Sequence, residues 1–410
     1  MSLPTIGYGI NARPSFKDDG ELIANLSSEH VPSASSSAKR LVIVGDVHGQ
    51  LASLKALLNK VSFDKEKGDH LVLAGDLVTR GPDSAGVVQL AMDLGASAVR
   101  GNQEDKVILF SGPYNNNKNT KHTKHTGQDD HARAVGKELS AAQLEWLKSL
   151  PVMLRIPKIG SDTTPAPWNA NEIVVAHGGL VPGLPLERQD PWGVMNMRTV
   201  TYPADEIRRK RVKERLKKWA ELRRLEDHIG KTDKQRNKSK IEVSDDDVNS
   251  EVERLRIEWS TSMRLPATAT SRAASLFDPL PNEQDKICLP SDKREGEPWA
   301  EAYSRAQNSI LDAVDRRVVI YGHDAKAGLQ VSPMIDYHTE GQFTRRKKNV
   351  MSEDVLMEKG TRYAFGLDSG CGHGRKLSAM VIELGSDGIV KTTVADTECS
   401  APSAKVDEDA

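Results

Sequence analysis

The sequence has few cysteines and no long apolar segment. Its three cysteines, Cys288, Cys371 and Cys399, stand among 410 residues, too few and too scattered to predict a disulfide framework or a thiolate zinc site. Cys371 has no second cysteine nearby in the sequence, so we expect a small buried residue there. No segment approaches the roughly 18 uncharged apolar residues that span a membrane, and the first residues lack a signal-peptide pattern. A soluble, cytoplasmic protein is the default expectation.

The chain also has almost no net charge. It carries 57 Lys and Arg against 58 Asp and Glu, a formal net charge of −1, which argues against a globally basic nucleic-acid binder. The charge is nevertheless uneven: residues 207–241 hold 15 basic and five acidic residues, and residues 242–258 hold seven acidic and two basic ones. Two interpretations stay open for 204–258, a solvated helical hairpin whose arms compensate each other and a surface that contacts a polyanion or a protein.

Short apolar runs alternate with helical patterns along the chain. Residues 51–61 and 84–94 have helical spacing, and residues 376–384 with 389–396 predict a closing pair of strands. The apolar runs have no polar interruption, the pattern of buried strands; they are Leu41–Val44, Leu71–Ala74, Ile173–Ala176 and Val318–Tyr321. This alternation predicts an α/β domain.

One domain over residues 39–396, with two insertions, is the expected organisation. Residues 1–38 are expected to be a disordered tail, because the stretch that ends it cannot bury enough apolar surface to become ordered. Residues 397–410 are expected to be an acidic tail. The insertions are 204–300, with a helix predicted over 204–229 from its apolar spacing, and 331–361. Residues 115–130 are polar and unpatterned, which indicates a mobile loop. The sequence predicts no oligomeric state.

Five loops at the ends of predicted strands carry side chains that bind metal ions. Carboxylate, imidazole and amide groups are ligands for iron, manganese or zinc in sites without thiolate, and glycine permits close backbone approach. Sites in α/β sheets form beyond the carboxyl ends of the strands, so these loops predict a dinuclear metal site. They are GDVHG (45–49), GDLVTRG (75–81), GNQE (101–104), HGG (177–179) and GHD (322–324).

This order of motifs resembles the calcineurin-like metallophosphoesterases of the phosphoprotein-phosphatase superfamily. The stretches GDLVTRGPDS, PWGVMNMR, YGHDAKAGLQ and FGLDSGCGHGRKLSAM are more similar to the branch of bacterial symmetrical diadenosine tetraphosphatase, the ApaH-like branch, which includes fungal endopolyphosphatases. The resemblance implies a metallophosphoesterase fold, with two facing mixed β-sheets flanked by helices. Here that fold would also carry a charged helical insertion. It implies a metal-dependent hydrolase with a phosphorylated or polyphosphate substrate.

The resemblance also implies the site residues. Asp76 would bridge two divalent ions, drawn from Mn, Zn, Fe, Co and Mg. Arg80 and Arg198 would bind phosphate, because a guanidinium matches two phosphate oxygens, and Asn102 would also contact the substrate. Together with Asp76 and Asn102 they would form the catalytic group. The full set of implied metal ligands is Asp46, His48, Asp76, Asn102, His177 and His323.

The acid dyad of the protein phosphatases is missing. That family has GDxVDRG and GNHE, whose histidine protonates the departing alkoxide; here the dyad positions are Thr79 and Gln103, neither of which titrates near neutrality. A phosphoanhydride leaves as a weakly basic phosphate, so the loss favours polyphosphate, dinucleoside polyphosphate or cap-like nucleotides. Two alternatives stay open: a protein phosphatase with another proton donor, for which His122, His125 and His131 are candidates, and an impaired enzyme that serves as a metal-binding scaffold.

Four other residues lie in or beside the matching stretches. Arg100 is expected to be solvated or structural. Asp368 and Lys376 fit a core or strand-edge role as well as a role in the site, and His373 either borders the pocket or stabilises its turn.

Overall fold

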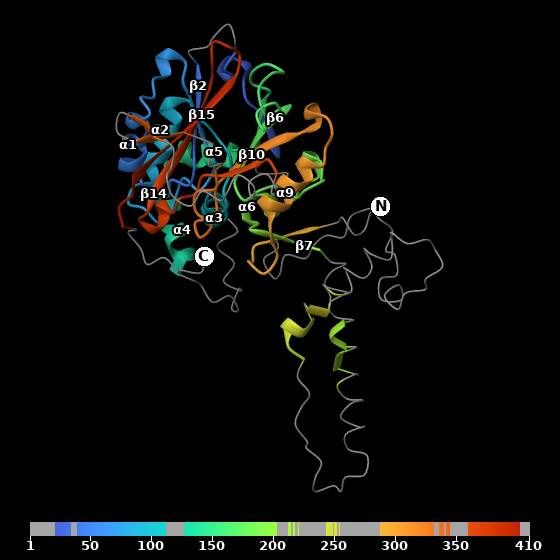
Figure 1. The fold of residues 1–410 in the computed structure, drawn as a ribbon. Coiled ribbons are helices and arrows are strands. Elements are labelled where there is room, and N and C mark those ends of the chain that lie inside the picture. Colours follow the sequence, from blue (N-terminus) through green and yellow to red (C-terminus); the bar gives the residue numbers. More distant parts are fainter. Residues whose placement is uncertain are drawn as a thin grey trace, which may run out of the picture. The chain divides into compact units, whose positions relative to one another are not determined.

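The computed structural model describes residues 21–33, 39–111, 127–202, 288–331, 336–339, 342–344 and 360–401, with scattered positions between 212 and 254. The chain divides into two compact units, residues 1–200 with 290–410 and residues 201–289. The first unit contains the two larger sheets and their helices (Figure 1).

The seven-stranded sheet has β2 near its middle, between β14 and β3. The pairing is antiparallel between β14 and β2 and parallel between β2 and β3 and between β3 and β4, so the sheet is mixed. Its order is β12 (Gln342–Thr344), β11 (Asp336–Thr339), β15 (Val390–Glu398), β14 (Lys376–Leu384), β2 (Arg40–Val44), β3 (His70–Leu73) and β4 (Ser97–Ala98).

The five-stranded sheet is also mixed. β5 and β6 are antiparallel, whereas β6 and β10 are parallel. The order is β1 (Ile23–Asn25), β5 (Met153–Pro157), β6 (Glu172–Ala176), β10 (Arg317–Tyr321) and β13 (Ala364–Gly366). A small third sheet has the order β8 (Leu289–Ser291), β7 (Thr199–Thr201) and β9 (Glu297–Pro298).

Helices cover the outer sides of these sheets. Figure 1 shows α1 and α2 beside the seven-stranded sheet and α9 beside β10. Caps fix several helix starts: Asp83 accepts from the backbone N of Gly86, and Ser140 forms a capping box with Gln143. The bounds are α1 Leu51–Lys60, α2 Ser84–Leu94, α3 Asn102–Ser111, α4 Gly127–Glu138, α5 Ala141–Ser149, α6 Pro191–Asn196 and α9 Trp299–Asn308.

Strand β2 is buried on both faces. Val42 and Val44 pack in one hydrophobic cluster with Leu54 of α1, while Ile43 between them is also fully buried. Because alternate residues of a strand point to opposite faces, the second face is covered as well. The predicted α/β architecture of two mixed sheets with helices is confirmed.

Two predicted tails are partly ordered. Residues 23–25 form β1, which pairs with β5, and Leu26 and Val31 are buried, so the expectation of disorder was wrong for 21–33. At the other end, β15 continues to Glu398, which shortens the acidic tail. The expected loop 115–130 also ends early, because α4 begins at Gly127. In each case contacts with distant segments order residues that have no strong local pattern.

Most of the two insertions lies outside the described residues. Within the helix predicted over 204–229, the described positions 212–214, 216–217 and 220 are helical, and within 331–361 the strands β11 and β12 are described. The end of the first insertion is described. Residues 289–291 and 297–298 form β8 and β9, and Trp299 at the start of α9 packs with its ring centroid 4.6 Å from that of Tyr321. This end of the predicted insertion is therefore part of the folded unit.

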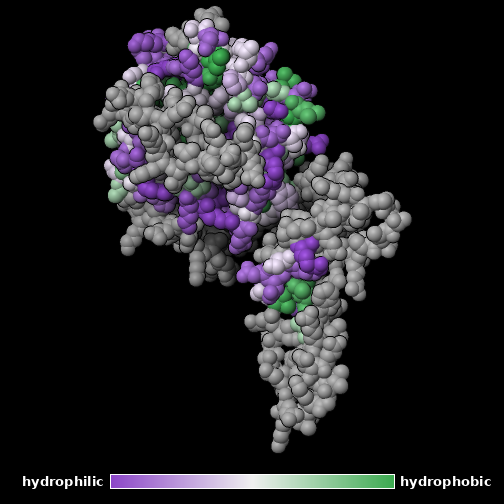
Figure 2. Space-filling model, in the orientation of Figure 1, coloured by the Kyte–Doolittle hydropathy of each residue, from purple (hydrophilic) through white to green (hydrophobic). Residues whose placement is uncertain are grey.

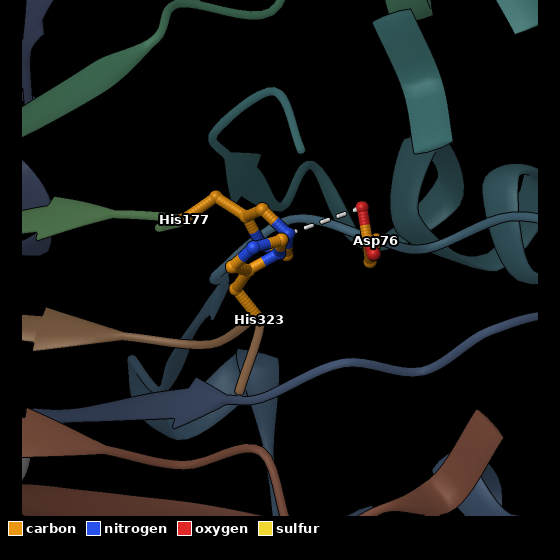
Figure 3. A group of neighbouring side chains, drawn as sticks. All are labelled: Asp76, His177 and His323. Atoms are coloured by element: carbon orange, nitrogen blue, oxygen red, sulfur yellow. Dashed lines mark ion pairs between the residues drawn. The ribbon is translucent and has the colours of Figure 1, made fainter. Parts of the chain in front are cut away.

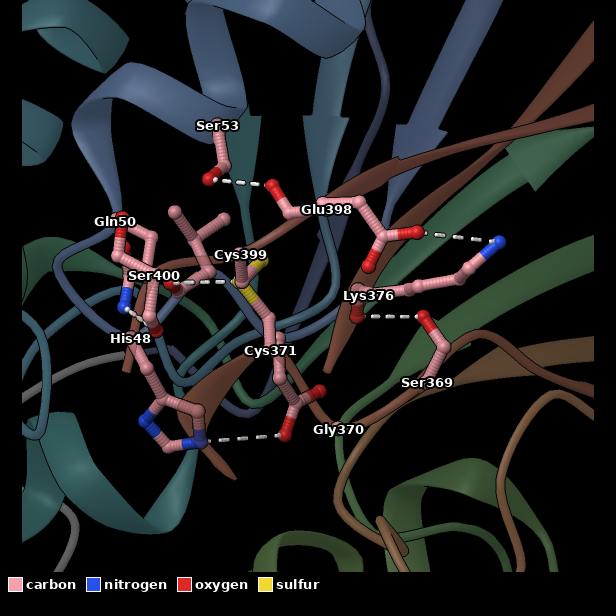
Figure 4. The surroundings of a disulfide bond; sticks show 12 residues. His48, Gln50, Ser53, Ser369, Gly370, Cys371, Lys376, Glu398, Cys399 and Ser400 are labelled. Atoms are coloured by element: carbon pink, nitrogen blue, oxygen red, sulfur yellow. Dashed lines mark hydrogen bonds and ion pairs between the residues drawn. A yellow bond between two sulfur atoms is a disulfide. The ribbon is translucent and has the colours of Figure 1, made fainter. Parts of the chain in front are cut away.

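Cys371 and Cys399 form a disulfide, with their Cα atoms 5.3 Å apart (Figure 4). The expectation that Cys371 has no partner was wrong. The antiparallel register pairs Lys376 with Glu398, so the turn before β14 meets the residue after β15. Cysteines 28 residues apart in sequence are thereby adjacent in space.

The surface is mostly hydrophilic on the face drawn in Figure 2, where hydrophobic side chains form small separate patches. Among the described residues, no helix combines the length and apolar character needed to cross a membrane.

Candidate metal centre

The structure brings the predicted metal ligands together in two clusters that share Asp76. The first consists of Asp46, His48 and Asp76, and the second of Asp76, His177 and His323. In each cluster the ligand atoms lie within 4.8 Å of one another. The loops that carry them follow β2, β3, β6 and β10, so the five predicted strand-end loops do converge, with Asn102 at the start of α3 as the fifth.

In the second cluster, the imidazoles of His177 and His323 lie together and the carboxylate of Asp76 lies opposite them (Figure 3). The Nε2 atom of His177 lies 3.2 Å from Oδ1 of Asp76 and 3.0 Å from Oδ1 of Asn102. The same amide oxygen lies 3.2 Å from Nδ1 of His323. In the first cluster, Nε2 of His48 lies 3.8 Å from Asp46 Oδ2 and 3.7 Å from Asp76 Oδ2.

Backbone carbonyls set which nitrogen of each histidine faces the cluster. Nδ1 of His48 lies 3.3 Å from the carbonyl of Val78, and Nδ1 of His177 lies 2.9 Å from that of Ala74. Nε2 of His323 lies 2.9 Å from the carbonyl of Asn196. A ring N–H that donates to a carbonyl leaves the other nitrogen as a lone pair. His48 and His323 therefore turn a lone pair toward the cluster.

This concentration of acceptor atoms fits a cation. Burial lowers the pKa of His48 to about 3, and burial together with His177 lowers that of His323, so both rings are neutral. Burial also disfavours charge on His177, but Asp76 and Asp46 outweigh it and raise its pKa to about 10. Burial, with the nearby charge of Asp368, raises the pKa of Asp46. A divalent ion that displaced the proton of His177 would meet three imidazoles and two buried carboxylates, a donor set that suits such an ion.

Several site residues have left-handed backbone conformations. The φ angles are 48° at His48, 51° at Asp76 and 71° at His323. The φ angles of Thr79 and Arg80 are also positive. Each such residue costs on the order of 1–3 kcal/mol and persists where surrounding bonds hold it. Here Glu104 supplies such bonds: its carboxylate accepts from the backbone N of Asp76, Leu77 and Gly101, at 2.8 Å each. We assigned Glu104 no role from the sequence, although its place in GNQE was a signal.

Glycines next to the ligands allow this close packing. A Cβ added at Gly101 would lie 2.3 Å from Asp76 Oδ1, and one added at Gly322 would lie 2.0 Å from Asp46 Oδ1. No side chain fits at either position without displacing the carboxylate.

Replacing Gly322 with alanine is therefore expected to weaken metal binding about 10- to 100-fold, as is typical when the groups that position a ligand are disturbed. Titration of metal-free protein with Mn²⁺ would measure it. Gly183→Ala is the control, since nothing lies within 4 Å of an added Cβ there, although Gly183 has a positive φ that Gly322 lacks. Equal metal affinity in both variants would contradict the expectation.

Arg80 and Arg198 line a cavity of about 500 Å³ together with His48, Asp76 and Asn102. The backbone N of Arg80 donates to Nε2 of His131 at 2.9 Å, and its Nη1 lies 3.3 Å from Nε2 of His373. Nη1 of Arg198 donates to the carbonyl of Asp292 at 3.1 Å. The two predicted phosphate-binding arginines thus share one cavity with the ligand clusters.

The dyad positions form a neutral hydrogen-bonded pair. Oγ1 of Thr79 donates to Oε1 of Gln103 at 3.1 Å, and the backbone N of Gln103 donates to Asp76 Oδ1 at 2.9 Å. The pair is buried and lies beside the shared ligand.

Arg100, Lys376 and Asp368 make structural contacts. Arg100 is buried and donates to the carbonyl of Lys148, a structural role. Lys376 pairs with Asp396 at 3.0 Å on the strand pair. Asp368 is buried and accepts from the backbone N of Gly370 at 2.9 Å, so it supports the turn that carries Cys371.

Of the described residues that line the cavity, Asn196, Asp292 and four cationic residues were missed from the sequence; the cationic ones are Lys106, Lys293, Arg294 and Lys326. Lys106 stands one helical turn after Gln103, a spacing that predicts a shared face. The other three are exposed residues in loops, where lysine and arginine are common without function.

Known proteins are similar to this chain in sequence. A model of the family described as calcineurin-like phosphoesterase matches residues 39–251, just over half of the chain. The symmetrical bis(5'-nucleosyl)-tetraphosphatase of Hamiltonella defensa is 34% identical over 144 residues, covering 34% of this chain and 44% of that protein. The enzyme of that name from Pectobacterium atrosepticum is 35% identical over 143 residues, covering 34% and 43%. The chain thus spans a little under half the length of the curated relatives it matches.

Solved structures are more distant. A chain described as a candidate diadenosine tetraphosphatase is 21% identical and has a TM-score of 0.47, covering 92% of this chain and 98% of that one. A metallophosphoesterase from Sphaerobacter thermophilus is 23% identical and has a TM-score of 0.22, covering 31% and 48%. The family match confirms the resemblance seen in the motifs. The chain belongs to the calcineurin-like phosphoesterase family and is distantly related to its symmetrical diadenosine tetraphosphatases.

Proposed function

We propose that this protein hydrolyses phosphoanhydride bonds, in polyphosphate or in dinucleoside polyphosphates and cap-like nucleotides. The observation that carries the proposal is the neutral pair of Thr79 and Gln103, joined at 3.1 Å beside Asp76. An alkoxide leaving group needs a proton, and general acid catalysis contributes about 10²–10⁴-fold to such reactions. A leaving phosphate is a weak base, so its departure depends far less on a proton donor.

The clusters support a role for two divalent ions. Asp46, His48 and Asp76 would hold one ion, and Asp76 would share the second with the amide of Asn102 and the imidazoles of His177 and His323. Bound there, divalent ions supply Lewis-acid charge to phosphoryl oxygens and make water a better nucleophile. The donor set suits several first-row ions, so Mn, Zn, Fe, Co and Mg all remain candidates.

The arginines would orient the substrate. Arg80 has positive φ and its backbone N is held by His131, so its position is fixed before a ligand binds. Arg198 is tied through Nη1 to the carbonyl of Asp292. Two guanidinium groups placed in advance can bind phosphate oxygens and offset the charge that develops on them.

The structure gives little support to a substitute acid. His131 accepts the backbone N–H of Arg80 through Nε2, and His373 lies against the same arginine. Among the described residues that line the cavity, neither of these histidines is present. His122 and His125 lie outside the described residues. A missing acid therefore favours anhydride cleavage over the protein phosphatase alternative.

A substrate panel tests the proposal against its alternatives. The protein, supplied with Mn²⁺, Zn²⁺, Co²⁺ or Mg²⁺, is assayed on tripolyphosphate, diadenosine tetraphosphate, a capped nucleotide and a phosphopeptide. We expect turnover of anhydrides. Turnover of the phosphopeptide alone would contradict the proposal, and bound metal without turnover of any substrate would indicate the scaffold.

Restoring the acid dyad tests whether its absence determines the substrate class. Thr79→Asp combined with Gln103→His is expected to raise phosphomonoester hydrolysis at least about tenfold, because it returns a proton donor to the site, and to raise anhydride cleavage less. Measured kcat values on p-nitrophenyl phosphate, a phosphopeptide and tripolyphosphate give the comparison. Thr79→Ser with Gln103→Asn is the matched control, since it keeps the pair neutral. An equal gain on all substrates would show that the pair does not set substrate class.

A further inference from the structure

The cavity has a basic wall beyond the two arginines. Lys106 extends from α3, Lys293 and Arg294 come from the loop between β8 and β9, and Lys326 comes from the turn after β10. With Arg80 and Arg198, six of the described residues that line the cavity are cationic, whereas Asp76 and Asp292 are the carboxylates among them. Because Asp76 belongs to the ligand clusters, the rest of the cavity surface attracts anions.

The loop that carries Lys293 and Arg294 is held in place. The backbone N of Arg198 donates to the carbonyl of Ser291 at 2.8 Å, and Oγ1 of Thr199 donates to the carbonyl of Lys293 at 2.7 Å. Gly296 fits so closely that an added Cβ would lie 2.5 Å from the carbonyl of Val200. These bonds anchor the loop to the segment that contains the second phosphate-binding arginine.

An ion pair joins this loop to the turn that bears Lys326. Nη1 of Arg294 lies 3.2 Å from Oδ2 of Asp324, and its Nη2 contacts the other oxygen. Asp324 follows His323 and also accepts from the backbone N of Ala327 at 3.1 Å. Lys293, Arg294 and Lys326, which we name the basic rim, are thus held at one side of the cavity and are exposed to solvent.

The cavity offers no platform for a nucleobase. Within the described part of the chain, no Phe, Tyr or Trp lines it. Proteins that bind nucleotides through their bases typically stack them on such rings. The lining instead provides cationic side chains. These bind phosphates whatever group stands at the end of the phosphate chain.

We propose that the basic rim is a second phosphate subsite, which binds phosphates of a linear polyphosphate chain beyond those held by Arg80 and Arg198. The inference rests on the proposed function and narrows its substrate class to inorganic polyphosphate. Affinity should increase with the number of phosphates and should not depend on a terminal nucleoside.

The first test removes two rim charges in the full chain. Lys293→Gln with Lys326→Gln is expected to raise KM for a long polyphosphate about tenfold and KM for tripolyphosphate by less, and to reduce the salt dependence of the long-chain KM. Arg294 is left unchanged because it contacts Asp324 beside a ligand candidate. Lys55→Gln with Lys391→Gln is the matched control, since both lysines are exposed and outside the cavity. An equal change in KM for both chain lengths, or no change in either, would contradict the assignment of the basic rim as a phosphate subsite.

The second test separates the rim from the reaction. Binding of long polyphosphate is measured by calorimetry in EDTA, which stops metal-dependent turnover. Weaker binding by the rim variant, with no anhydride cleaved by the wild type, would support the rim and contradict the proposed function. If the wild type cleaves anhydrides but the rim variant has unchanged binding and KM, the proposed function is supported and the rim is contradicted.

A third comparison addresses the nucleoside. Inorganic tetraphosphate and diadenosine tetraphosphate are expected to compete with long polyphosphate to a similar extent. If diadenosine tetraphosphate binds tenfold more tightly, the preference for an inorganic chain is wrong.

Discussion

Replacing Asp76 with asparagine is expected to lower anhydride hydrolysis about a thousandfold and to remove both metal ions. The carboxylate belongs to both ligand clusters: Oδ1 lies 3.2 Å from His177 Nε2 and Oδ2 lies 3.7 Å from His48 Nε2. Asparagine keeps the shape but loses the charge, and its NH₂ group cannot bind a cation. Loss of one preorganised electrostatic group costs about 10²–10³-fold, and here the two sites lose a ligand together.

The readout is metal content as well as rate. Metal per chain, measured by mass spectrometry after dialysis, should fall from two ions toward none, while circular dichroism shows that the variant is folded. Asp312→Asn is the control, because Asp312 is exposed and its side chain makes no cap bond. An Asp76→Asn protein that keeps both ions and wild-type turnover would contradict the shared-ligand assignment.

Loss of the disulfide is expected to lower the free energy of unfolding by about 3.6 kcal/mol, the chain-entropy estimate for a loop of this length. The bond joins residues 28 apart and closes the turn at Cys371 on the end of β15. That turn also packs on the first cluster, since a Cβ at Gly372 would lie 2.3 Å from Cδ2 of His48. Cys399→Ser should therefore weaken metal binding in addition to stability.

Denaturation with and without dithiothreitol measures the effect, and Cys288→Ser is the control because Cys288 is not part of the disulfide. Reductant should destabilise the wild type and the control but not Cys399→Ser. Thiol titration of denatured, unreduced protein should find one thiol per chain. Three thiols per chain would show that Cys371 and Cys399 are not bonded. Disulfides persist mainly in oxidising compartments, which weighs against the cytoplasmic default drawn from absent signals.

The sequence predicted which side chains meet at the edge of the sheets, because each motif is local. Each ligand motif directly follows a short apolar strand, and strand ends at one edge of a sheet bring such loops together. Asp46, His48, Asp76, Asn102, His177 and His323 could therefore be chosen from motif and order alone. Their roles as ligands, and those of Arg80 and Arg198 with phosphate, stay predictions that the proposed variants test.

Features that depend on register or on distant contacts could not be predicted in this way. The disulfide requires the pairing of Lys376 with Glu398, which no local pattern specifies. Strand β1 has three residues and pairs with β5 far along the chain, so its sequence resembled a tail. The basic rim combines loops around residues 293 and 326, whose lysines are not distinguishable by sequence from solvated ones.

The position of β14 bears on how the protein is made. In the seven-stranded sheet β14 lies between β2 and β15 and pairs with β2 from Ala379 to Glu383. While a ribosome is still synthesising the second half of the chain, the strand that precedes Asp46 and His48 has an open edge. Non-local pairing of this kind is slow and leaves hydrophobic strands exposed. Val42 and Ile43 would therefore need protection from aggregation until residue 384 has emerged, and chains cut before β14 should be recovered as insoluble protein.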